Sequence, residues 1–261
     1  MKKLFYILTP VLVFAIASCN KKEDPTPTTP TTPTTATPTP PSPSVPGVYG
    51  AFVSLVMTYS TVQVGVPIDL NTETGLAAIY QDPWTASGTN TMIDGGTIKV
   101  NNIALDKGTN NAYSKIATAG QTPSDLGFSS GVSWTVTGNA NFPAVTRNLT
   151  NYAPDFTGTV PETVTRTAGI TLTLSASTAP HADSVYVMLV SGSTSKLWRY
   201  AYNAGSVIIP ASELSSFSAS STTNPAYLEI CPWNVQYYTE GMSKTCAYVR
   251  ERAIVKSVTL N

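Results

Sequence analysis

The chain contains a single histidine, His181, which lies two residues before Asp183 and three before Ser184. These are the residue types of a hydrolase triad, in which histidine takes the proton of the serine hydroxyl. The members of a triad converge from separate segments, whereas these three residues belong to one short segment, and no G-x-S-x-G turn presents a serine. We therefore expect a turn before a strand here, no catalytic residues and a non-enzymatic protein.

Acidic residues are the second class of side chain that could do chemistry. Glycoside hydrolysis needs two carboxyl groups on opposite sides of the scissile bond, and no spacing in this chain selects a pair. Asp82, Asp94 and Asp106 could bind calcium, but the D-x-[DN]-x-[DN]-G pattern is missing. A single histidine also excludes multi-histidine zinc and copper sites. We expect no metal, no cofactor, and turn aspartates that bind their own backbone.

The first 18 residues have the layout of a signal peptide. A basic start is followed by an apolar run from Leu4 to Ser18, which is shorter than the about 20 residues that a membrane-spanning helix needs. The small residues directly before Cys19 resemble the bacterial lipobox, in which the cysteine receives lipid and becomes the first mature residue. This resemblance implies that a lipid anchor on Cys19 holds the protein at a membrane. An ordinary cleaved secretory signal is the alternative.

Residues 19–46 are expected to link this anchor to a folded head. The charged run Asn20–Asp24 resembles the export signal of Bacteroidota lipoproteins, which implies the outer membrane and its exterior face, with the periplasmic face as the alternative. In Pro25–Pro46, nine of 22 residues are proline and nine are threonine. Proline favours extended polyproline II backbone, which at ~3.1 Å per residue reaches roughly 70 Å.

Two cysteines, Cys231 and Cys246, remain once Cys19 is lipidated. An even number of cysteines in an exported protein favours a disulfide. We therefore predict a bridge between neighbouring strands, with two buried free thiols as the alternative.

The charge balance argues against a nucleic-acid partner. Charged residues make up 11% of the chain, with 15 basic and 15 acidic side chains. From residue 47 onward, 11 basic and 13 acidic residues remain, so the head has no excess of positive charge to attract phosphates.

Apolar residues alternate with small polar ones throughout the head, as in Val132–Thr137 and Ile170–Ser175. A period of two indicates half-buried β-strands. Further strands are expected at Phe52–Thr58, Thr61–Ile68, Leu76–Tyr80, Thr97–Leu105, Ser184–Val190, Lys196–Tyr202, Ser206–Pro210, Tyr227–Cys231, Tyr237–Met242, Thr245–Val249 and Ala253–Leu260. Helical turns are expected only at Ala211–Phe217 and near Ser124–Leu126.

Many short strands indicate an all-β protein with antiparallel sheets. Two prolines and a glycine interrupt the strand pattern between residues 152 and 161. Two immunoglobulin-like β-sandwich domains are therefore expected, at residues 47–157 and 158–261, each of typical size. One jelly-roll-like domain is the alternative.

Three segments resemble uncharacterised Bacteroidota outer-membrane lipoproteins with tandem β-sandwich units. The resemblance is carried by Gly96–Leu105 with Tyr113, by Trp134–Gly138 and by Ala182–Val185. It covers most of the head and supports the fold and the location, and it transfers no catalytic residue. Asp183-Ser184-Val185 also resembles the O-glycosylation motif of exported Bacteroidota proteins.

Aromatic residues are the candidates for ligand binding. Trp198, Tyr200 and Tyr202 share one face of a strand by period two, and Trp233 lies near another hairpin. Indole and phenol rings can stack on sugars, but aromatic residues at alternate strand positions also fill sandwich cores. Because Arg199 on the opposite face prefers water, we expect Trp198 to point inward.

These observations favour a cell-surface lipoprotein that acts as a binding or adhesion module for a protein or a glycan. A glycan-binding accessory lipoprotein of a polysaccharide-uptake system is the alternative, and a secreted hydrolase is the third.

Overall fold

The computed structural model describes residues 45–63, 66–150 and 153–261. The expected signal peptide, Cys19 and the linker up to Ser44 lie outside these residues. The described chain is mostly β-strand with almost no helix, so the expected all-β class is confirmed. We find no helix among these residues that has the length and hydropathy to cross a membrane.

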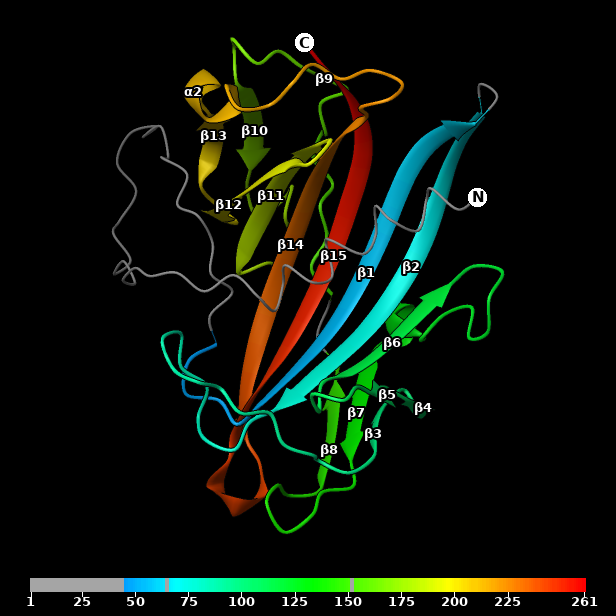
Figure 1. Ribbon diagram of the computed structural model, residues 1–261, viewed down its shortest axis with the longest axis vertical. Coiled ribbons are helices and arrows are strands. Elements are labelled where there is room, and N and C mark those ends of the chain that lie inside the picture. The colour runs from blue at the N-terminus through cyan, green and yellow to red at the C-terminus, as the bar shows by residue number, and fades with distance from the viewer. Residues whose placement is uncertain (1–44, 64–65, 151–152) are drawn as a thin grey trace.

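One long sheet runs through the whole head. Its central strands are β14 (Ala226–Thr239), β15 (Thr245–Leu260), β1 (Gly50–Gln63) and β2 (Val66–Ile79), which extend from the upper to the lower part of the molecule in Figure 1. The strand order is β12-β11-β14-β15-β1-β2-β6-β5, and β9 also pairs with β15. The outer strands are β12 (Thr194–Ala201), β11 (Ser184–Ser191), β6 (Tyr113–Thr118), β5 (Asp106–Lys107) and β9 (Thr163–Val164).

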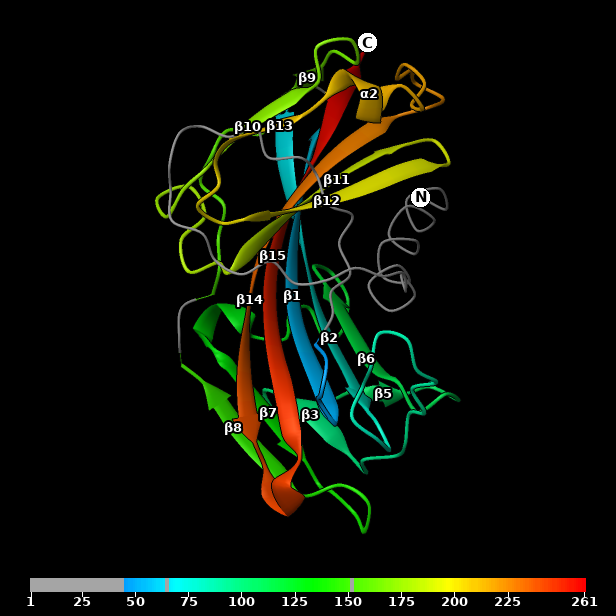
Figure 2. The same ribbon diagram turned by 90° about the vertical axis from the view of Figure 1, so that its left-hand side faces the viewer.

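Two smaller sheets pack on this long sheet. The upper one pairs β10 (Ile170–Leu174) with β13 (Gly205–Ile209), and the helical turn α2 (Ala211–Leu214) follows where one was expected. The lower one has the order β4-β3-β7-β8, and its strands β3, β7 and β8 lie in the lower part of Figure 2. Its strands are β4 (Ile103–Ala104), β3 (Ile98–Val100), β7 (Val132–Val136) and β8 (Val145–Leu149), and the 3₁₀ turns are η1 (Phe128–Ser130) and η2 (Gly241–Ser243).

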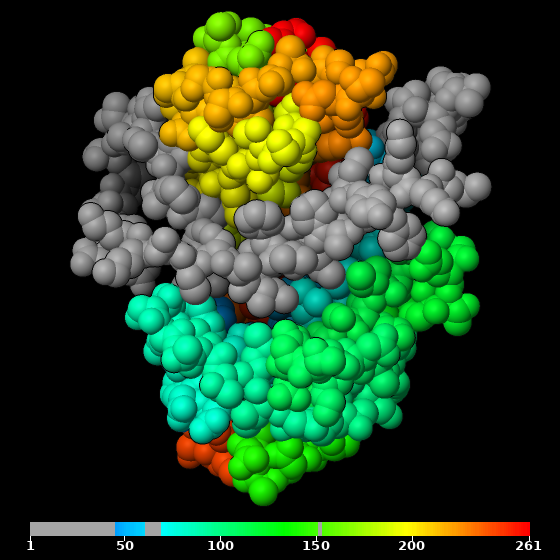
Figure 3. Space-filling view, viewed as in Figure 1, coloured from blue at the N-terminus to red at the C-terminus, as the bar shows by residue number. Residues whose placement is uncertain are grey.

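Each small sheet encloses a hydrophobic core with the same face of the long sheet. In the lower core, Phe52 stacks on Tyr248 with ring centroids 4.9 Å apart, and Trp134 of β7 packs against Phe52 at 5.3 Å. In the upper core, Trp198 of β12 lies among side chains of β10, β13 and β14. The two cores correspond to the upper and lower parts of the space-filling view, whose surfaces are yellow to orange and cyan to green (Figure 3).

The central strands are longer than the sequence predicts, because they continue through polar residues between the two cores. Ser54, Asn234 and Arg250 are neighbours in register on the core face, and all three are buried. Arg250 Nε donates to Asn234 Oδ1 at 3.4 Å, and Ser54 Oγ donates to the carbonyl of Val249 at 3.3 Å. Polar side chains with partners such as these let the backbone stay in the sheet where a break was expected.

The two halves therefore share one sheet, although two separate sandwiches were expected. β1 pairs with β15 in parallel, with Phe52 beside Tyr248, which joins the first strand of the head to the last. Along the chain, Leu149 is in the lower core and Phe156 is in the upper core, so the crossover lies next to the predicted boundary at residues 157/158. The division into two domains stays a prediction.

Candidate functional site

The face of the long sheet opposite to the two cores carries a third hydrophobic cluster, and we call this face the outer face. Every member of the cluster belongs to the long sheet, whereas the other two cores include side chains of a second sheet. The cluster consists of Leu55, Met57, Tyr186, Cys231, Trp233, Val249 and Ala253, with Val53, Leu197, Val235 and Val255 packed against it. Within the described residues, this cluster is therefore a single layer of side chains.

An aromatic pair belongs to the outer-face cluster. The rings of Tyr186 and Trp233, on the paired strands β11 and β14, are stacked with centroids 5.5 Å apart and planes 7° apart. The guanidinium of Arg199 lies over the Trp233 ring, 5.0 Å from its centroid. Farther along β14, Tyr237 exposes half of its side chain. The stacked pair itself is buried, so Tyr237 is the accessible aromatic residue of this face, and exposed aromatic residues are typical of protein contact sites.

Two carboxyl groups lie beside this pair. Glu229 and Glu251 point to the outer face from β14 and β15, because they alternate with the core-facing Ile230 and Arg250. Burial raises the pKa of Glu229 to about 7, with the charge of Glu251 as a smaller cause. Burial also raises the pKa of Glu251 to about 7. Near neutral pH these carboxyl groups are thus partly protonated and able to donate a hydrogen bond.

Two buried donors of the outer face have no acceptor. Within the described part of the chain, neither the indole Nε1–H of Trp233 nor the hydroxyl of Tyr186 has a hydrogen-bond partner. Burial raises the pKa of the Tyr186 hydroxyl well above its usual range, so it keeps its proton. A buried donor without a partner costs about 1–3 kcal/mol. Both atoms are shielded from solvent, so an acceptor recovers this cost only if neighbouring side chains move to admit it.

Sequence reasoning missed Glu229, Glu251 and Tyr186 as members of a site. Glu229 and Glu251 are 22 positions apart in the chain, and only the β14–β15 register brings them to one face. A signal was present in the sequence for Glu229, which stands among apolar residues of a strand, whereas Glu251 lies between Arg250 and Arg252 and carries no such signal. The expected strand Tyr227–Cys231 contains Glu229, and a charged residue at that position indicates a polar group on the face opposite to Leu228 and Ile230.

The proposed platform of Trp198, Tyr200 and Tyr202 is not a surface. Trp198 and Tyr200 are 2% and 4% exposed and belong to the upper core, and Tyr202 packs against that core. Arg199 is exposed on the opposite face, as expected. Trp198 and Tyr200 therefore do not form an exposed platform, and the inward orientation of Trp198 is confirmed. Trp233 also is only 6% exposed, but it lies on the outer face.

His181, Asp183 and Ser184 have structural contacts in the described chain. The carbonyl of His181 accepts from Asn234 Nδ2 at 2.8 Å, and the carboxylate of Asp183 accepts from the Val235 amide at 2.8 Å. Ser184 is buried at the start of β11, where its hydroxyl accepts from Arg199 Nε at 3.3 Å. The turn is thus held against β14, and the buried Ser184 is a poor site for the glycosylation that its motif suggested.

The expected disulfide is absent, since Cys231 and Cys246 are both free and buried. Cys231 belongs to the outer-face cluster, and Cys246 belongs to the lower core. Burial raises the pKa of the Cys246 thiol to about 12 and raises that of Cys231 well above its usual value. The alternative of two buried thiols is therefore the correct one.

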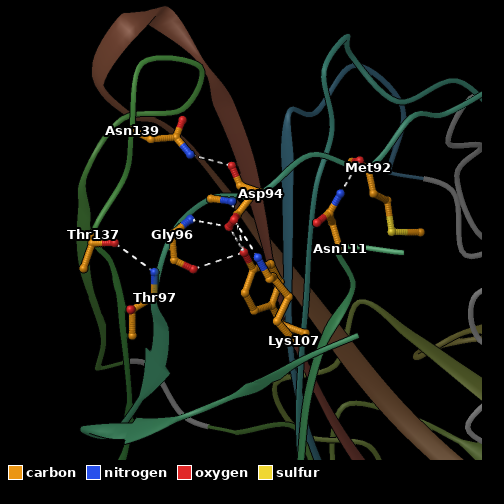
Figure 4. A network of polar contacts seen from close by, with 10 residues as sticks. Met92, Asp94, Gly96, Thr97, Lys107, Asn111, Thr137 and Asn139 are labelled. Carbon is orange, nitrogen blue, oxygen red and sulfur yellow. Dashed lines mark hydrogen bonds and ion pairs between the residues drawn. The ribbon is translucent and has the colours of Figure 1, made fainter. Parts of the chain in front are cut away.

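Asp94 organises a polar network at the edge of the lower core (Figure 4). Its carboxylate accepts from Lys107 Nζ and from the Tyr113 hydroxyl, both at 2.6 Å, and from the Gly96 amide at 2.8 Å. The hydrogen bond from Lys107 is the largest of the causes that hold the pKa of Asp94 far below its usual range. Asp94 is thus a turn aspartate that also ties β5 and β6 to the β3 turn.

Other expected ligands lie apart from one another. Asp106 pairs with Lys115 at 3.0 Å, and Asp82 is exposed. Over the three described ranges, no group of three or more histidine, cysteine, aspartate or glutamate side chains could hold a metal ion. A cavity of about 200 Å³ between the two cores, lined by Ser54, Ser129 and Arg250, is smaller than the about 300 Å³ of the smallest usual ligand pockets.

Comparison of the chain with models of protein families, with curated proteins and with solved structures found no match.

Proposed function

We propose that this chain is a lipid-anchored protein on the exterior of the outer membrane, and that its head is a non-enzymatic module that binds or adheres to another protein through the outer face. One observation carries the proposal: a hydrophobic cluster with a stacked aromatic pair lies in a single layer on one face of the long sheet. The seven members of the cluster are each at most 8% exposed, but within the described residues no second sheet packs on them. An apolar layer without such a cover is a candidate interaction site.

A protein partner is better supported than a glycan. The aromatic residues that would form a sugar platform, Trp198 and Tyr200, fill the upper core instead. The side chains around Trp233 are mainly aliphatic, and aliphatic surface suits an apolar partner better than hydroxyl-rich sugars. For the glycan alternative, only Trp233 would remain to stack on a sugar, and only Glu229 and Glu251 would remain to bind its hydroxyl groups.

A hydrolase is supported less well than binding. Glu229 and Glu251 share the outer face, but both have their pKa raised to about 7. A pair of catalytic carboxyl groups works when the environment separates the two pKa values, so that one group is an acid and the other a base.

The anchor and the fold family belong to the same proposal. The lipobox-like segment before Cys19 and the charged run after it support the membrane location. Packing of an antiparallel sheet on each half of the long sheet supports an immunoglobulin-like character of the two halves. Replacing Cys19 with serine should move the protein from the membrane fraction to the soluble fraction, and unchanged lipid labelling would contradict the anchor.

The binding surface is tested with two matched lysine substitutions. Tyr237 and Met242 are both large, exposed hydrophobic residues, with 50% and 58% exposure, and only Tyr237 lies on the outer face. Cells that display each variant are measured for retention on panels of immobilised extracellular proteins and polysaccharides. We expect Tyr237→Lys to lower retention on proteins and Met242→Lys to leave it unchanged. Equal retention of both variants, or a loss on polysaccharides alone, would overturn the proposal.

A further inference from the structure

We propose that the proline- and threonine-rich segment, residues 25–44, binds the outer face of its own chain around Tyr186 and Trp233. The inference rests on the proposed role of the outer face as a binding surface, and it names the chemistry of the occupant, an extended proline-rich strand. A partner that presents such a strand would then compete with the chain's own segment.

The outer face offers donors that lack acceptors. The Nε1–H of Trp233 and the hydroxyl of Tyr186 are buried without a partner, although their rings stack in one place. The guanidinium of Arg199 adds further donors beside the Trp233 ring. An occupant that satisfies this face must therefore be rich in acceptors.

A proline-rich strand has this property. Proline has a carbonyl but no N–H, and in polyproline II the carbonyls are not used within the strand. Such strands bind to grooves lined with aromatic side chains, and their stiff backbone loses little entropy on binding. Residues 25–44 contain eight prolines and nine threonines, whose rings and methyl groups match an apolar, aromatic surface.

Charge is compatible with this contact. Residues 25–44 contain no lysine, arginine, aspartate or glutamate, so their docking buries no unpaired charge of the segment. On the outer face, Glu229 and Glu251 have raised pKa values, so they are partly protonated near neutral pH. Covering a protonated carboxyl group with an uncharged segment costs less desolvation free energy than covering a carboxylate.

The segment is long enough to reach the aromatic pair. It is followed directly by Val45–Gly50, and Gly50 pairs with Cys246 at one end of the long sheet. Trp233 pairs with Glu251, five residues farther along β15, which is about 17 Å at 3.4 Å per residue. Twenty residues of polyproline II extend about 62 Å. A tethered segment also has an effective concentration in the millimolar range, so a weak contact suffices.

The test uses a soluble form of the chain, residues 19–261 with Cys19→Ser, and a second form in which residues 25–44 are replaced by a glycine-serine segment of equal length. The probe is a synthetic peptide of residues 25–44, titrated into each form by calorimetry. We expect the peptide to bind the replaced form, and to bind the form with its own segment at least about tenfold more weakly, because that segment competes.

A matched pair of substitutions shows where the peptide binds. Tyr186 and Tyr200 both have a buried hydroxyl without a partner, but Tyr200 lies in the upper core. In the replaced form, Tyr186→Phe should weaken peptide binding about 3- to 10-fold, since one hydrogen bond is lost. Tyr200→Phe should leave it unchanged.

Three results would overturn the inference: no binding of the peptide to the replaced form, equal binding to both forms, or equal effects of Tyr186→Phe and Tyr200→Phe. A dimer that disappears when the segment is replaced would also overturn it, since the segment would then bind a second copy. The proposed function fails separately, through the retention of the Tyr237→Lys variant.

Discussion

Cys231 and Cys246 lie on the neighbouring strands β14 and β15, with their side chains on opposite faces of the long sheet. Ile230 pairs with Ile254 and Trp233 with Glu251, which places Cys231 beside Ala253, seven residues from Cys246. Along one strand, positions an odd number of residues apart point to opposite faces, so Cys246 faces away from the side that Ala253 and Cys231 share. Seven residues of strand also extend about 24 Å. A disulfide needs Cα atoms within about 7 Å, so this fold excludes the bridge.

Both thiols should therefore be present and unreactive in the folded protein. In the Cys19→Ser chain, we expect the intact mass to be the same with and without reductant. Alkylation should modify Cys231 and Cys246 only after unfolding, because burial keeps both thiols protonated and inaccessible. A mass lower by two hydrogens without reductant would contradict the register of β14 and β15.

Trp198→Ala should destabilise the fold by about 3–5 kcal/mol, the usual cost of removing a large aromatic side chain from a core. Denaturant unfolding measures the loss, and retention on polysaccharide gels should not change. Trp84→Ala is the control, because Trp84 is only partly buried. An unchanged midpoint of unfolding for Trp198→Ala would contradict the placement of Trp198 in the upper core.

Asp94→Asn should lower the stability at pH 7 by about 1 kcal/mol, a small value because half of the side chain is solvent-exposed. The pKa of Asp94 is lower in the folded chain than its ordinary value of 3.8. Its contribution is therefore complete above about pH 4 and is lost as the pH falls further. Unfolding midpoints at pH 3 and pH 7 measure this difference, with Asp82→Asn as the control.

Glu229 and Glu251 should affect stability in the direction opposite to Asp94, because they destabilise the fold as the pH rises. Glu229→Gln and Glu251→Gln remove this effect. Their folded pKa of about 7 lies above the ordinary value of 4.5, so the folded state binds more protons between these two pH values. Stability should thus fall as the pH rises from 4.5 to 7, and each variant should gain about 1–3 kcal/mol over the natural chain at pH 8.

The control for this pair is Glu162→Gln, because Glu162 is exposed. Unfolding in denaturant at pH 4.5 and pH 8 is the measurement. Equal stability of the natural chain and both variants at pH 8 would show that Glu229 and Glu251 are fully solvated, and that the outer face is open to water.

The sequence by itself determined the all-β class and the orientation of Trp198. Both follow from local physics: a period of two identifies strands, and the contrast between Trp198 and Arg199 identifies the buried face of β12. The α2 turn was likewise readable from its own residues. Such features depend on a few neighbouring side chains, so a single sequence contains them.

Only the tertiary structure decided the length of the central strands, the faces of the two cysteines and the placement of Glu229 and Glu251 on one face. Asn234 and Arg250 lie in gaps between expected strands until the pairing of β14 with β15 makes them neighbours. Register between strands far apart in the chain sets these relations. It is chosen by the packing of whole faces, which no local pattern contains.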